Sequence, residues 1–205
     1  MSNELHTISI EEAQARAERA DTALREAAEA AGLVDVAVGT MPSPVGELYL
    51  AVTRKGLACI AFEEQDRDGL ERRFAQELSP RVVASARATD AVRRQLDEYF
   101  GGARHAFELD LDRRLMSPFV EKVLGATAAV PFGEVSSYGA VASRIRRPNA
   151  ARAVGAALGT NPIPIVVPCH RIVGANGKLT GYAGGLDRKE FLLHLEGDPT
   201  LFATS

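Results

Sequence analysis

The residues best suited to chemistry are the adjacent Cys169 and His170, which lie at the end of the stretch NPIPIVVPCHR (161–171). A thiolate is a strong nucleophile, but a free thiol with a pKa of ~8.5 is mostly protonated at neutral pH. A nearby base such as histidine activates the thiol, and that histidine needs an acceptor that orients its ring. Glu196, in the sequence HLEG, is a candidate for this acceptor. The pattern indicates a nucleophilic cysteine.

The prolines before Cys169 predict how the thiol is held. Proline fixes its own φ angle, and the residue before a proline is pushed towards extended geometry. We therefore expect residues 161–168 to be stiff and extended, which would hold the thiol in one place for one substrate atom. Neighbours on an extended chain point in opposite directions. If residues 169–171 begin a tight turn or helix, we expect His170 to reach Cys169 only indirectly, through one water.

Two other interpretations of Cys169 are a metal ligand and an inert core thiol. Zinc needs four ligands, usually as closely spaced Cys and His pairs. The chain has two cysteines and four histidines, with no paired spacing. We therefore predict no metal site and no cofactor. Cys59 lies between Ala58 and Ile60 in an apolar run, so for that cysteine we favour the inert core interpretation.

Length and composition restrict the protein class. The chain has 205 residues, is 46% hydrophobic and carries a net charge of −3. No apolar run reaches the ~18–20 residues of a membrane helix, and the acidic N-terminus lacks the apolar region of a secretory signal. With only two cysteines, the sequence predicts a cytoplasmic protein without a disulfide framework.

Charge is distributed unevenly along the chain. Residues 1–36 contain eight acids and three bases, whereas residues 133–195 contain eight bases and three acids. Phosphates respond to the nearest charges, so the second half suits nucleic acid better than the overall charge does. Charge alone is equally typical of an ordinary solvated basic face.

The first half of the chain predicts a small α+β unit. Alanine-rich residues 9–31 predict a helix with Ser9 as its N-cap and Gly32 as its stop. Alternation and turn residues over 36–62 predict antiparallel strands. Helices are expected over 66–78 and 89–100, and one more strand over 106–111.

The second half predicts mostly helices. Ser117 and Pro118 begin a helix as N-cap and first helical residue. Two short helices, in SSYGAVASRI and AARAVGAALGTN, resemble a helix-turn-helix, and 187–196 predicts a last helix. The expected fold class is therefore α+β: a small N-terminal antiparallel sheet with helices, followed by a mostly helical C-terminal domain that contains the helix-turn-helix. The expected divisions are an arm of unknown role (1–35), an N-terminal α/β domain (36–112) and a C-terminal acceptor domain (117–205).

Several motifs in order carry a specific resemblance. They are PFGEVSSYGAVA, RAVGAA, PCHR preceded by NP, GKLTGYAGG and a K-x-x-L-L-x-x-E-G helix. The chain resembles the O6-alkylguanine-DNA alkyltransferases, which are the methylated-DNA–protein-cysteine methyltransferases. The resemblance covers residues 36–197, is strongest over 131–197, and implies a ribonuclease H-like N-terminal domain.

The resemblance implies direct-reversal DNA repair. Such proteins flip the damaged nucleotide out of the duplex, because an atom inside the base stack is out of reach. The alkyl group of O6-alkylguanine, and also of O4-alkylthymine, then passes once and irreversibly to a cysteine. The resemblance makes Cys169 the acceptor and His170 its base through a water, with Glu196 orienting His170 and Asn161 bracing the cysteine loop.

The resemblance also implies a DNA-binding surface. Tyr138 would help rotate the target nucleotide, and Arg152 would fill the hole left by the flipped base. Small residues including Ala151 and Gly155 would allow close approach to the minor groove, and binding would be nearly independent of sequence. The protein is expected to be a monomer that is able to bind DNA cooperatively. The guanine pocket would be formed by Pro164, Ile172, Tyr182 and Ala183, with the Ala183 N–H as a donor to O6.

Other functions remain open from the sequence. One is a non-catalytic protein that binds alkylated lesions, although relatives of that class replace the cysteine. A Cys-His hydrolase is another, but nothing in the sequence marks an acyl substrate. A transcription regulator is a third, although residues 1–35 are short and lack cysteine. The sequence departs from some relatives at Ala183, where they carry serine.

Overall fold

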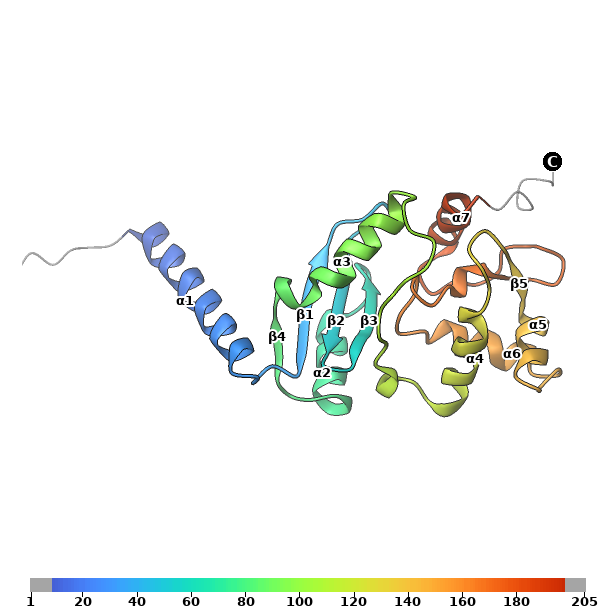
Figure 1. Ribbon diagram of the computed structural model, residues 1–205, viewed down its shortest axis with the longest axis horizontal. Helices are drawn as coiled ribbons and strands as arrows, with labels where there is room; N and C mark the ends of the chain where they lie inside the picture. Colours follow the sequence, from blue (N-terminus) through green and yellow to red (C-terminus); the bar gives the residue numbers. More distant parts are fainter. Residues whose placement is uncertain (1–8, 198–205) are drawn as a thin grey trace, which may run out of the picture.

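The computed structural model describes residues 9–197, which form two packed units and one projecting helix (Figure 1). The first unit is a sheet with a helix on each face, and the second is a group of short helices. The first unit contains β1 (Val36–Met41), β2 (Leu48–Thr53), β3 (Gly56–Phe62), α2 (Arg67–Glu77), β4 (Val82–Ala84) and α3 (Ala86–Phe100). The expected α+β fold class is confirmed.

The sheet has the strand order β3-β2-β1-β4. Strands β1 to β3 form the expected antiparallel meander, with Val38 opposite Ala51 and Leu50 opposite Ile60. The fourth strand, β4, was not predicted and pairs parallel to β1. The sheet is therefore mixed, because the chain passes through α2 before it returns beside β1.

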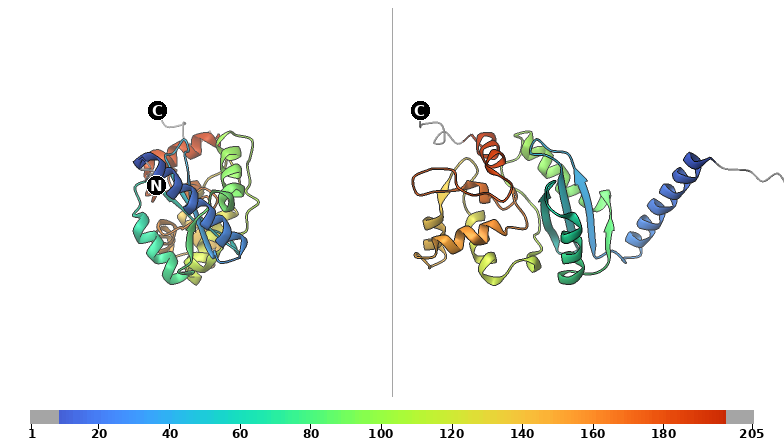
Figure 2. Two further views of the ribbon diagram at one scale, coloured as in Figure 1. Left: turned by 90° about the vertical axis from the view of Figure 1, so that its left-hand side faces the viewer. Right: turned by 180° about the vertical axis from the view of Figure 1, so that it is seen from behind.

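Both faces of the sheet are buried. Alternate residues of the strands belong to two different cores, because successive side chains of a strand point to opposite faces. Tyr49 and Cys59 pack on the face that contains Phe74 of α2, whereas Leu50 packs on the face that contains Leu96 of α3. The two views in Figures 1 and 2 show α2 and α3 on opposite sides of the strands.

Helix α1 (Ile10–Ala30) projects away from both units (Figures 1 and 2). Its start is the predicted one: the Ser9 hydroxyl accepts from the Glu12 N–H, and the Glu12 carboxylate accepts from the Ser9 N–H. Gly32, at a φ of 68°, follows its end. Ile10 and Leu24 remain 79% and 69% exposed. The helix is therefore formed by local capping and alanine content without a packed apolar face.

The strand expected over 106–111 is wrong. Only Leu111 forms an isolated bridge, with Leu57. Farther upstream, the Gln95 side chain takes the place of a neighbouring strand. Its amide donates to the Glu108 carbonyl at 3.0 Å and accepts from the Glu108 N–H at 2.8 Å. The Gln95 side chain of α3 thus makes the hydrogen bonds to the Glu108 backbone that a neighbouring β-strand would otherwise make.

The second unit is built from short elements around α4 (Pro118–Ala128). Ser117 caps α4 as predicted, because its hydroxyl accepts from the Val120 N–H. The remaining elements are η1 (Arg113–Leu115), β5 (Ser136–Ser137), α5 (Tyr138–Arg144), α6 (Ala151–Gly159), η2 (Cys169–Arg171), β6 (Ile172–Val173) and α7 (Leu186–Leu195). The parallel pair β5–β6 was not predicted.

Helices α5 and α6 are the two helices for which a helix-turn-helix is predicted. Ser137 caps α5, and the turn between the helices places Arg146 at a φ of 59°. Val141 of α5 and Val154 of α6 are fully buried, and both belong to one core with Val123 of α4. The pair therefore presents one face to α4 and leaves the start of α6 exposed, where Arg152 lies. Its assignment as a DNA-binding motif stays a prediction.

Candidate active site

The segment before Cys169 is a series of tight turns, so the expectation of an extended segment over 161–168 is wrong. The Val166 N–H donates to the Pro164 carbonyl at 2.9 Å, the Val167 N–H donates to Ile163, and the Cys169 N–H donates to Val167 at 2.8 Å. Proline excludes helix from the residue before it but does not prevent turns. Residues 161–168 therefore form a compact series of turns, and their stiffness stays a prediction.

Ile165 shows that this compact shape is strained. Its φ of 72° lies in the left-handed region, which a β-branched residue rarely adopts. Such a residue costs about 1–3 kcal/mol and persists only where its surroundings fix it. Ile165 is fully buried, and the carbonyl of Pro162 accepts at 2.8 Å from Ile60 on the sheet edge. The N-terminal sheet therefore helps to hold the turn that carries the thiol.

Cys169 is buried, and Asn161 holds its sulfur. The Asn161 Nδ2 donates to Sγ at 3.1 Å and to the Val167 carbonyl at 3.0 Å, while its Oδ1 accepts from the Ile163 N–H at 3.0 Å. The side chain of Asn161 thus spans the turn, as the resemblance implied. Burial raises the pKa of the Cys169 thiol, and the hydrogen bond from Asn161 and the charge of Lys189 oppose that rise. A donor placed on sulfur favours the thiolate.

His170 follows Cys169 within a 3-10 turn formed by residues 169–171. Its Nε2 lies 3.0 Å from Oε1 of Glu196, and among residues 9–197 its buried Nδ1 has no hydrogen-bond partner. Because a carboxylate can only accept, Nε2 carries the proton and Nδ1 is left as a base. Burial lowers the pKa of His170, so the ring is neutral at neutral pH.

Glu196 follows the end of α7 and is the most densely bonded group of the site. Its two oxygens accept from His170, from Nε and Nη2 of Arg171 at 2.8 and 2.9 Å, and from the Tyr99 hydroxyl at 2.7 Å. Burial raises the pKa of Glu196, but these hydrogen bonds outweigh it and hold the pKa at about 2. The carboxylate is therefore ionised, as an acceptor that orients an imidazole must be.

Sequence reasoning missed three side chains of this network: Arg171, Tyr99 and Lys189. Arg171 belongs to the PCHR motif, from which no role was predicted for it. Besides its bonds to Glu196, its Nη1 donates to the Val130 carbonyl at 2.6 Å. Lys189 is fully buried, and its Nζ donates to the carbonyls of Ile172 at 2.6 Å and Thr180 at 2.9 Å. The sequence feature that indicates a buried Lys189 is its position on the same face of the last helix as Leu192 and Leu193. Tyr99 lies 97 residues from Glu196, and no local pattern relates the two.

Lys189 is a cation without an acidic partner among the hydrogen bonds of the described chain. Burial lowers its pKa to about 8, and the nearby Cys169 sulfur opposes this shift. Its two carbonyl acceptors lie in β6 and in the segment that precedes the GYAGG loop. Lys189 therefore fastens that segment and adds positive charge near the sulfur, which favours the thiolate.

A pocket of about 600 Å³ opens onto Cys169. It is formed by the start of α5, one side of α6 and the loop before α7. The Tyr138 hydroxyl accepts from Thr180 at 3.2 Å and donates to the Gly181 carbonyl at 3.4 Å, which joins α5 to that loop. The predicted residues that line the pocket are Tyr138, Ala151, Arg152, Gly155, Tyr182 and Ala183.

A second cavity of about 210 Å³ lies between the two units and also reaches Cys169. Pro164, Tyr182 and Ala183 line it, as does Phe62 of the sheet. Among the described residues, the buried Tyr182 hydroxyl has no hydrogen-bond partner. Ile172 is not among the residues that line either cavity, and its predicted place in the guanine pocket stays a prediction. It is fully buried in β6, where its backbone accepts from Lys189.

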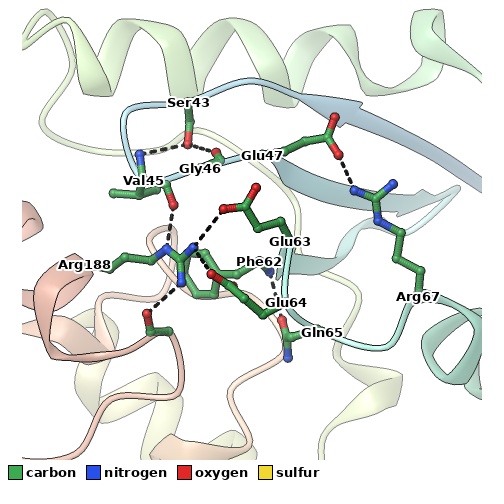
Figure 3. Close-up of polar contacts among 11 residues, drawn as sticks. Ser43, Val45, Gly46, Glu47, Phe62, Glu63, Glu64, Gln65, Arg67 and Arg188 are labelled. Atoms are coloured by element: carbon green, nitrogen blue, oxygen red, sulfur yellow. Dashed lines mark hydrogen bonds and ion pairs between the residues drawn. The ribbon is translucent and has the colours of Figure 1, made fainter.

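Arg188 joins the pocket loop to the sheet unit (Figure 3). Its Nε donates to the Val45 carbonyl at 2.6 Å and its Nη1 to the Gly184 carbonyl at 3.0 Å. Nη2 pairs with Glu64, and the guanidinium lies 4.8 Å from the centre of the Phe62 ring. One residue of α7 thus fixes the loop that contains Tyr182 and Ala183 against the first unit.

Residues 9–197 contain no group of three or more His, Cys, Asp or Glu side chains able to hold a metal ion. In the same part of the chain, none of the helices is long and apolar enough to cross a membrane.

Comparison with protein families gives two adjacent matches. Residues 36–113 match the ribonuclease-like domain of 6-O-methylguanine DNA methyltransferase, and residues 118–198 match its DNA-binding domain. The boundary between the two matches falls where the sheet unit gives way to α4.

Individual relatives agree with these matches. The chain is 45% identical over 157 residues to the methylated-DNA–protein-cysteine methyltransferase of Mycolicibacterium paratuberculosis, covering 77% of this chain and 90% of the relative. It is 42% identical over 159 residues to the protein of that name from Salmonella typhimurium, covering 76% and 92%.

Solved structures extend the similarity to the fold. The O6-methylguanine methyltransferase of Mycobacterium tuberculosis superposes with a TM-score of 0.69 at 40% identity, covering 82% of this chain and 99% of that one. The M. tuberculosis protein OGT in complex with DNA superposes with a TM-score of 0.68, at the same identity and coverage.

Proposed function

The chain belongs to the 6-O-methylguanine DNA methyltransferase family, and from this premise we propose how its own residues carry out direct-reversal DNA repair. The protein binds DNA and acts as a single-turnover methylated-DNA–protein-cysteine methyltransferase. The alkyl group passes from O6 of a flipped-out guanine to Sγ of Cys169. O4-alkylthymine, whose alkylated oxygen is chemically similar, is proposed as a second substrate.

One observation carries the assignment of Cys169. Its sulfur accepts from a side-chain donor, Asn161, and Cys169 lines a pocket of about 600 Å³, which is large enough for a flipped base. Tyr138, Arg152 and Tyr182 also line this pocket. A thiol that is both fixed and reachable is what a transfer to one atom requires.

The transfer step follows from the proton positions. Nδ1 of His170 takes the thiol proton through one bridging water, as Nε2 remains bonded to Glu196. Sγ then forms a bond to the alkyl carbon while the bond from that carbon to O6 breaks, and the electron pair of the broken bond stays on guanine. The proton held by His170 then passes to the departing guanine. The products are unmodified guanine and a thioether, which explains why each chain acts once.

The departing guanine needs donors near O6, because negative charge develops there as the bond breaks. We propose the backbone N–H of Ala183 for this role and the unpartnered hydroxyl of Tyr182 as a second donor at the same wall of the pocket. Pro164 forms an apolar wall from the side of the second cavity. The hydrogen bond from Arg188 to Gly184 keeps this wall in place.

DNA is proposed to bind across the start of α6 through its minor groove. Ala151 and Gly155 lie in the pocket wall, where their small size allows close approach, and Arg152 is placed to fill the gap left by the flipped base. Tyr138 lies beside Gly155, with its ring 3.6 Å from where a Cβ would stand, and helps rotate the nucleotide. Affinity from phosphate contacts should fall as salt rises and depend little on sequence.

In solution we propose a monomer, with any association between copies arising on DNA. Analytical ultracentrifugation of the free protein and of complexes on duplexes of increasing length tests this proposal. A stable dimer in the absence of DNA would overturn it.

Mass spectrometry tests the proposed transfer directly. The protein is mixed with a duplex that carries one O6-methylguanine, digested with trypsin, and compared with a sample mixed with undamaged duplex. A gain of one methylene on peptide 153–171, saturating at one per chain, is the expected result. Peptide 56–67, which contains Cys59, is the internal control and should stay unmodified. An unmodified 153–171 peptide together with tight binding of the lesion would support the non-catalytic lesion-binding function instead.

A further inference from the structure

Tyr99 brings the N-terminal unit into direct contact with the acceptor site. It lies near the end of α3, is fully buried, and donates its hydroxyl proton to Oε1 of Glu196 at 2.7 Å. In the part of the chain that the structure describes, no other side chain of residues 36–112 hydrogen-bonds to His170 or Glu196. The His170–Glu196 pair is thus completed by a residue from the other unit.

The geometry of this hydrogen bond is firmly set. The Tyr99 ring packs against Phe100, Phe107 and Phe132, with centroid separations of 5.5, 5.3 and 6.2 Å. Phe107 and Phe132 come from two different loops, so the ring is held from several directions. The hydroxyl therefore has a fixed position, and a phenylalanine in its place would keep the same ring contacts.

The oxygen that Tyr99 contacts is the one that faces His170. Oε1 of Glu196 accepts from the Tyr99 hydroxyl, from Nε2 of His170 at 3.0 Å and from Nη2 of Arg171 at 2.9 Å. Each donor withdraws negative charge from that oxygen. The more charge the other donors withdraw, the less the carboxylate stabilises a positively charged imidazole.

We propose that Tyr99 is a positioning residue that limits the basicity of the His170–Glu196 pair, so that His170 stays neutral until it takes the proton of Cys169. The proposal rests on the proposed function, because it concerns the base of that transfer. It gives the N-terminal unit a part in the chemistry as well as in the packing.

The charges around His170 support this role. Arg171 in η2 and Lys189 in α7 are the cations that face the ring, Glu196 is the anion, and Cys169 is the neighbouring titratable group. Burial lowers the pKa of His170, both cations lower it further, and Glu196 opposes them. A neutral histidine is required because only the neutral ring is able to accept a proton. Tyr99 acts in the same direction as the cations by weakening the one group that favours the charged ring.

The test is the pH dependence of single-turnover methyl transfer in Tyr99→Phe. The rate constant is measured from about pH 5 to about pH 8 with excess protein over O6-methylguanine duplex. In the wild type the acidic limb should have its midpoint below the ordinary histidine value of 6.5. Loss of the hydroxyl should move this midpoint upwards by about half a pH unit and lower the rate about twofold at the wild-type midpoint.

Tyr49→Phe is the matched control. Tyr49 lies in the same unit, is also buried, and donates its hydroxyl to Glu71 at 2.6 Å on the opposite face of the sheet. Its replacement removes the same kind of hydrogen bond without touching the acceptor site. The control should therefore leave the midpoint of the acidic limb unchanged, even if both variants lose some stability.

A double variant separates basicity from general damage. With Glu196→Gln already present, Tyr99→Phe should produce no further shift, since the anion whose charge Tyr99 withdraws is gone. An unchanged midpoint in Tyr99→Phe, with wild-type transfer intact, would overturn the role of Tyr99 and leave the proposed function standing. Absence of transfer in the wild type would overturn the proposed function itself, so the two failures are distinguishable.

Discussion

The two cysteines of this chain are almost equally buried and differ in nearly everything around them. Cys59 is 4% exposed and Cys169 is 6% exposed. Both are free thiols, and burial raises the pKa of each, for Cys59 to about 12. Burial by itself would therefore make both sulfurs equally inert.

The difference lies in the groups around each sulfur. Cys59 packs among apolar side chains in the middle of β3, and the charge of Arg73 is the influence that opposes the rise of its pKa. Cys169 follows a strained turn, and its sulfur accepts a hydrogen bond from Asn161. The charge of Lys189 opposes the rise of its pKa, and the residue lines a large pocket. Cys169, the proposed acceptor, thus differs from Cys59 in having a side-chain donor on its sulfur and a large pocket open to it.

The largest expected effect comes from removing one sulfur or the other. Cys169→Ser should abolish methyl uptake, with a fall of at least about 1,000-fold in the rate, because a serine hydroxyl is hardly ionised at neutral pH. Cys59→Ala should keep the wild-type rate and lose about 1–2 kcal/mol of stability as a buried sulfur is removed. Transfer of a radiolabelled methyl group from duplex DNA measures the first effect, and urea unfolding measures the second. Methyl uptake by Cys169→Ser would contradict the comparison.

Glu196→Gln should have the next largest effect. The amide can donate as well as accept, so it no longer fixes the His170 tautomer, and it lacks the charge that matches Arg171, so transfer should slow by about 100- to 1,000-fold. Stability should also drop by about 3 kcal/mol, because a buried guanidinium loses its anion. Glu71→Gln, which alters the acceptor of the other buried tyrosine, Tyr49, is the control and should leave the rate unchanged. Stopped-flow transfer and urea unfolding of the same samples measure both quantities.

Asn161→Ala should have an intermediate effect on the transfer rate and should change the pKa of Cys169 but not the reactivity of Cys59. Its loss removes the donor on Sγ, so the pKa of Cys169 should rise further and methyl transfer should slow by about tenfold or more. Iodoacetamide labelling as a function of pH, read on the two cysteine peptides separately, measures this change. The midpoint for peptide 153–171 should move upwards while the labelling of Cys59 stays as in the wild type. An equal change at both sites would indicate general loosening of the fold.

Lys189→Met should give the smallest effect, seen as a change in how stability depends on pH. The folded lysine loses its proton near pH 8, whereas the unfolded lysine keeps it to about its ordinary pKa of 10.5. Between these values the unfolded chain binds more protons, so this group makes stability rise with pH. Relative to the variant, the wild type should gain about 2 kcal/mol from pH 7.5 to about pH 9.5.

Urea unfolding across that pH range is the measurement for Lys189→Met. A Lys189→Arg variant is the matched control, because arginine keeps its charge throughout and should show no such rise. Parallel curves for the wild type and Lys189→Met would mean that Lys189 titrates normally in the folded protein.

Local patterns in the sequence predicted the elements well where the chemistry is local. The cap at Ser117, the Ser9–Glu12 start of α1 and the three-stranded meander all depend on residues close in sequence. Predictions of secondary structure failed where a group distant in sequence hydrogen-bonds to the backbone of the segment. The strand expected over 106–111 is replaced by bonds from Gln95, and the extended segment over 161–168 is replaced by turns against the sheet edge.

The candidate site divides in the same way. Residue types and motif order indicated Cys169, His170, Glu196 and Asn161. In the structure Asn161 hydrogen-bonds to Cys169, and Glu196 hydrogen-bonds to the adjacent His170. The place of Ile172 in the guanine pocket stays a prediction, because a motif gives neighbours in sequence and not the direction of a side chain. Tyr99 was missed, since it acts through a tertiary contact that no short pattern records. Lys189 lies within the K-x-x-L-L-x-x-E-G motif, but the motif does not show that its ammonium donates to the Ile172 carbonyl.

The sequence by itself determined the family, and it predicted most of the helices and strands that carry the proposed nucleophile and its proposed base. Only the tertiary structure decided how the thiol differs from the other buried cysteine, because that difference arises from Asn161, Lys189 and an open pocket placed around it. It also decided that α3 of the N-terminal unit supplies a hydrogen bond to Glu196. The physical reason is that a side chain's reactivity depends on the charges and donors a few ångströms away, and those are brought there by folding.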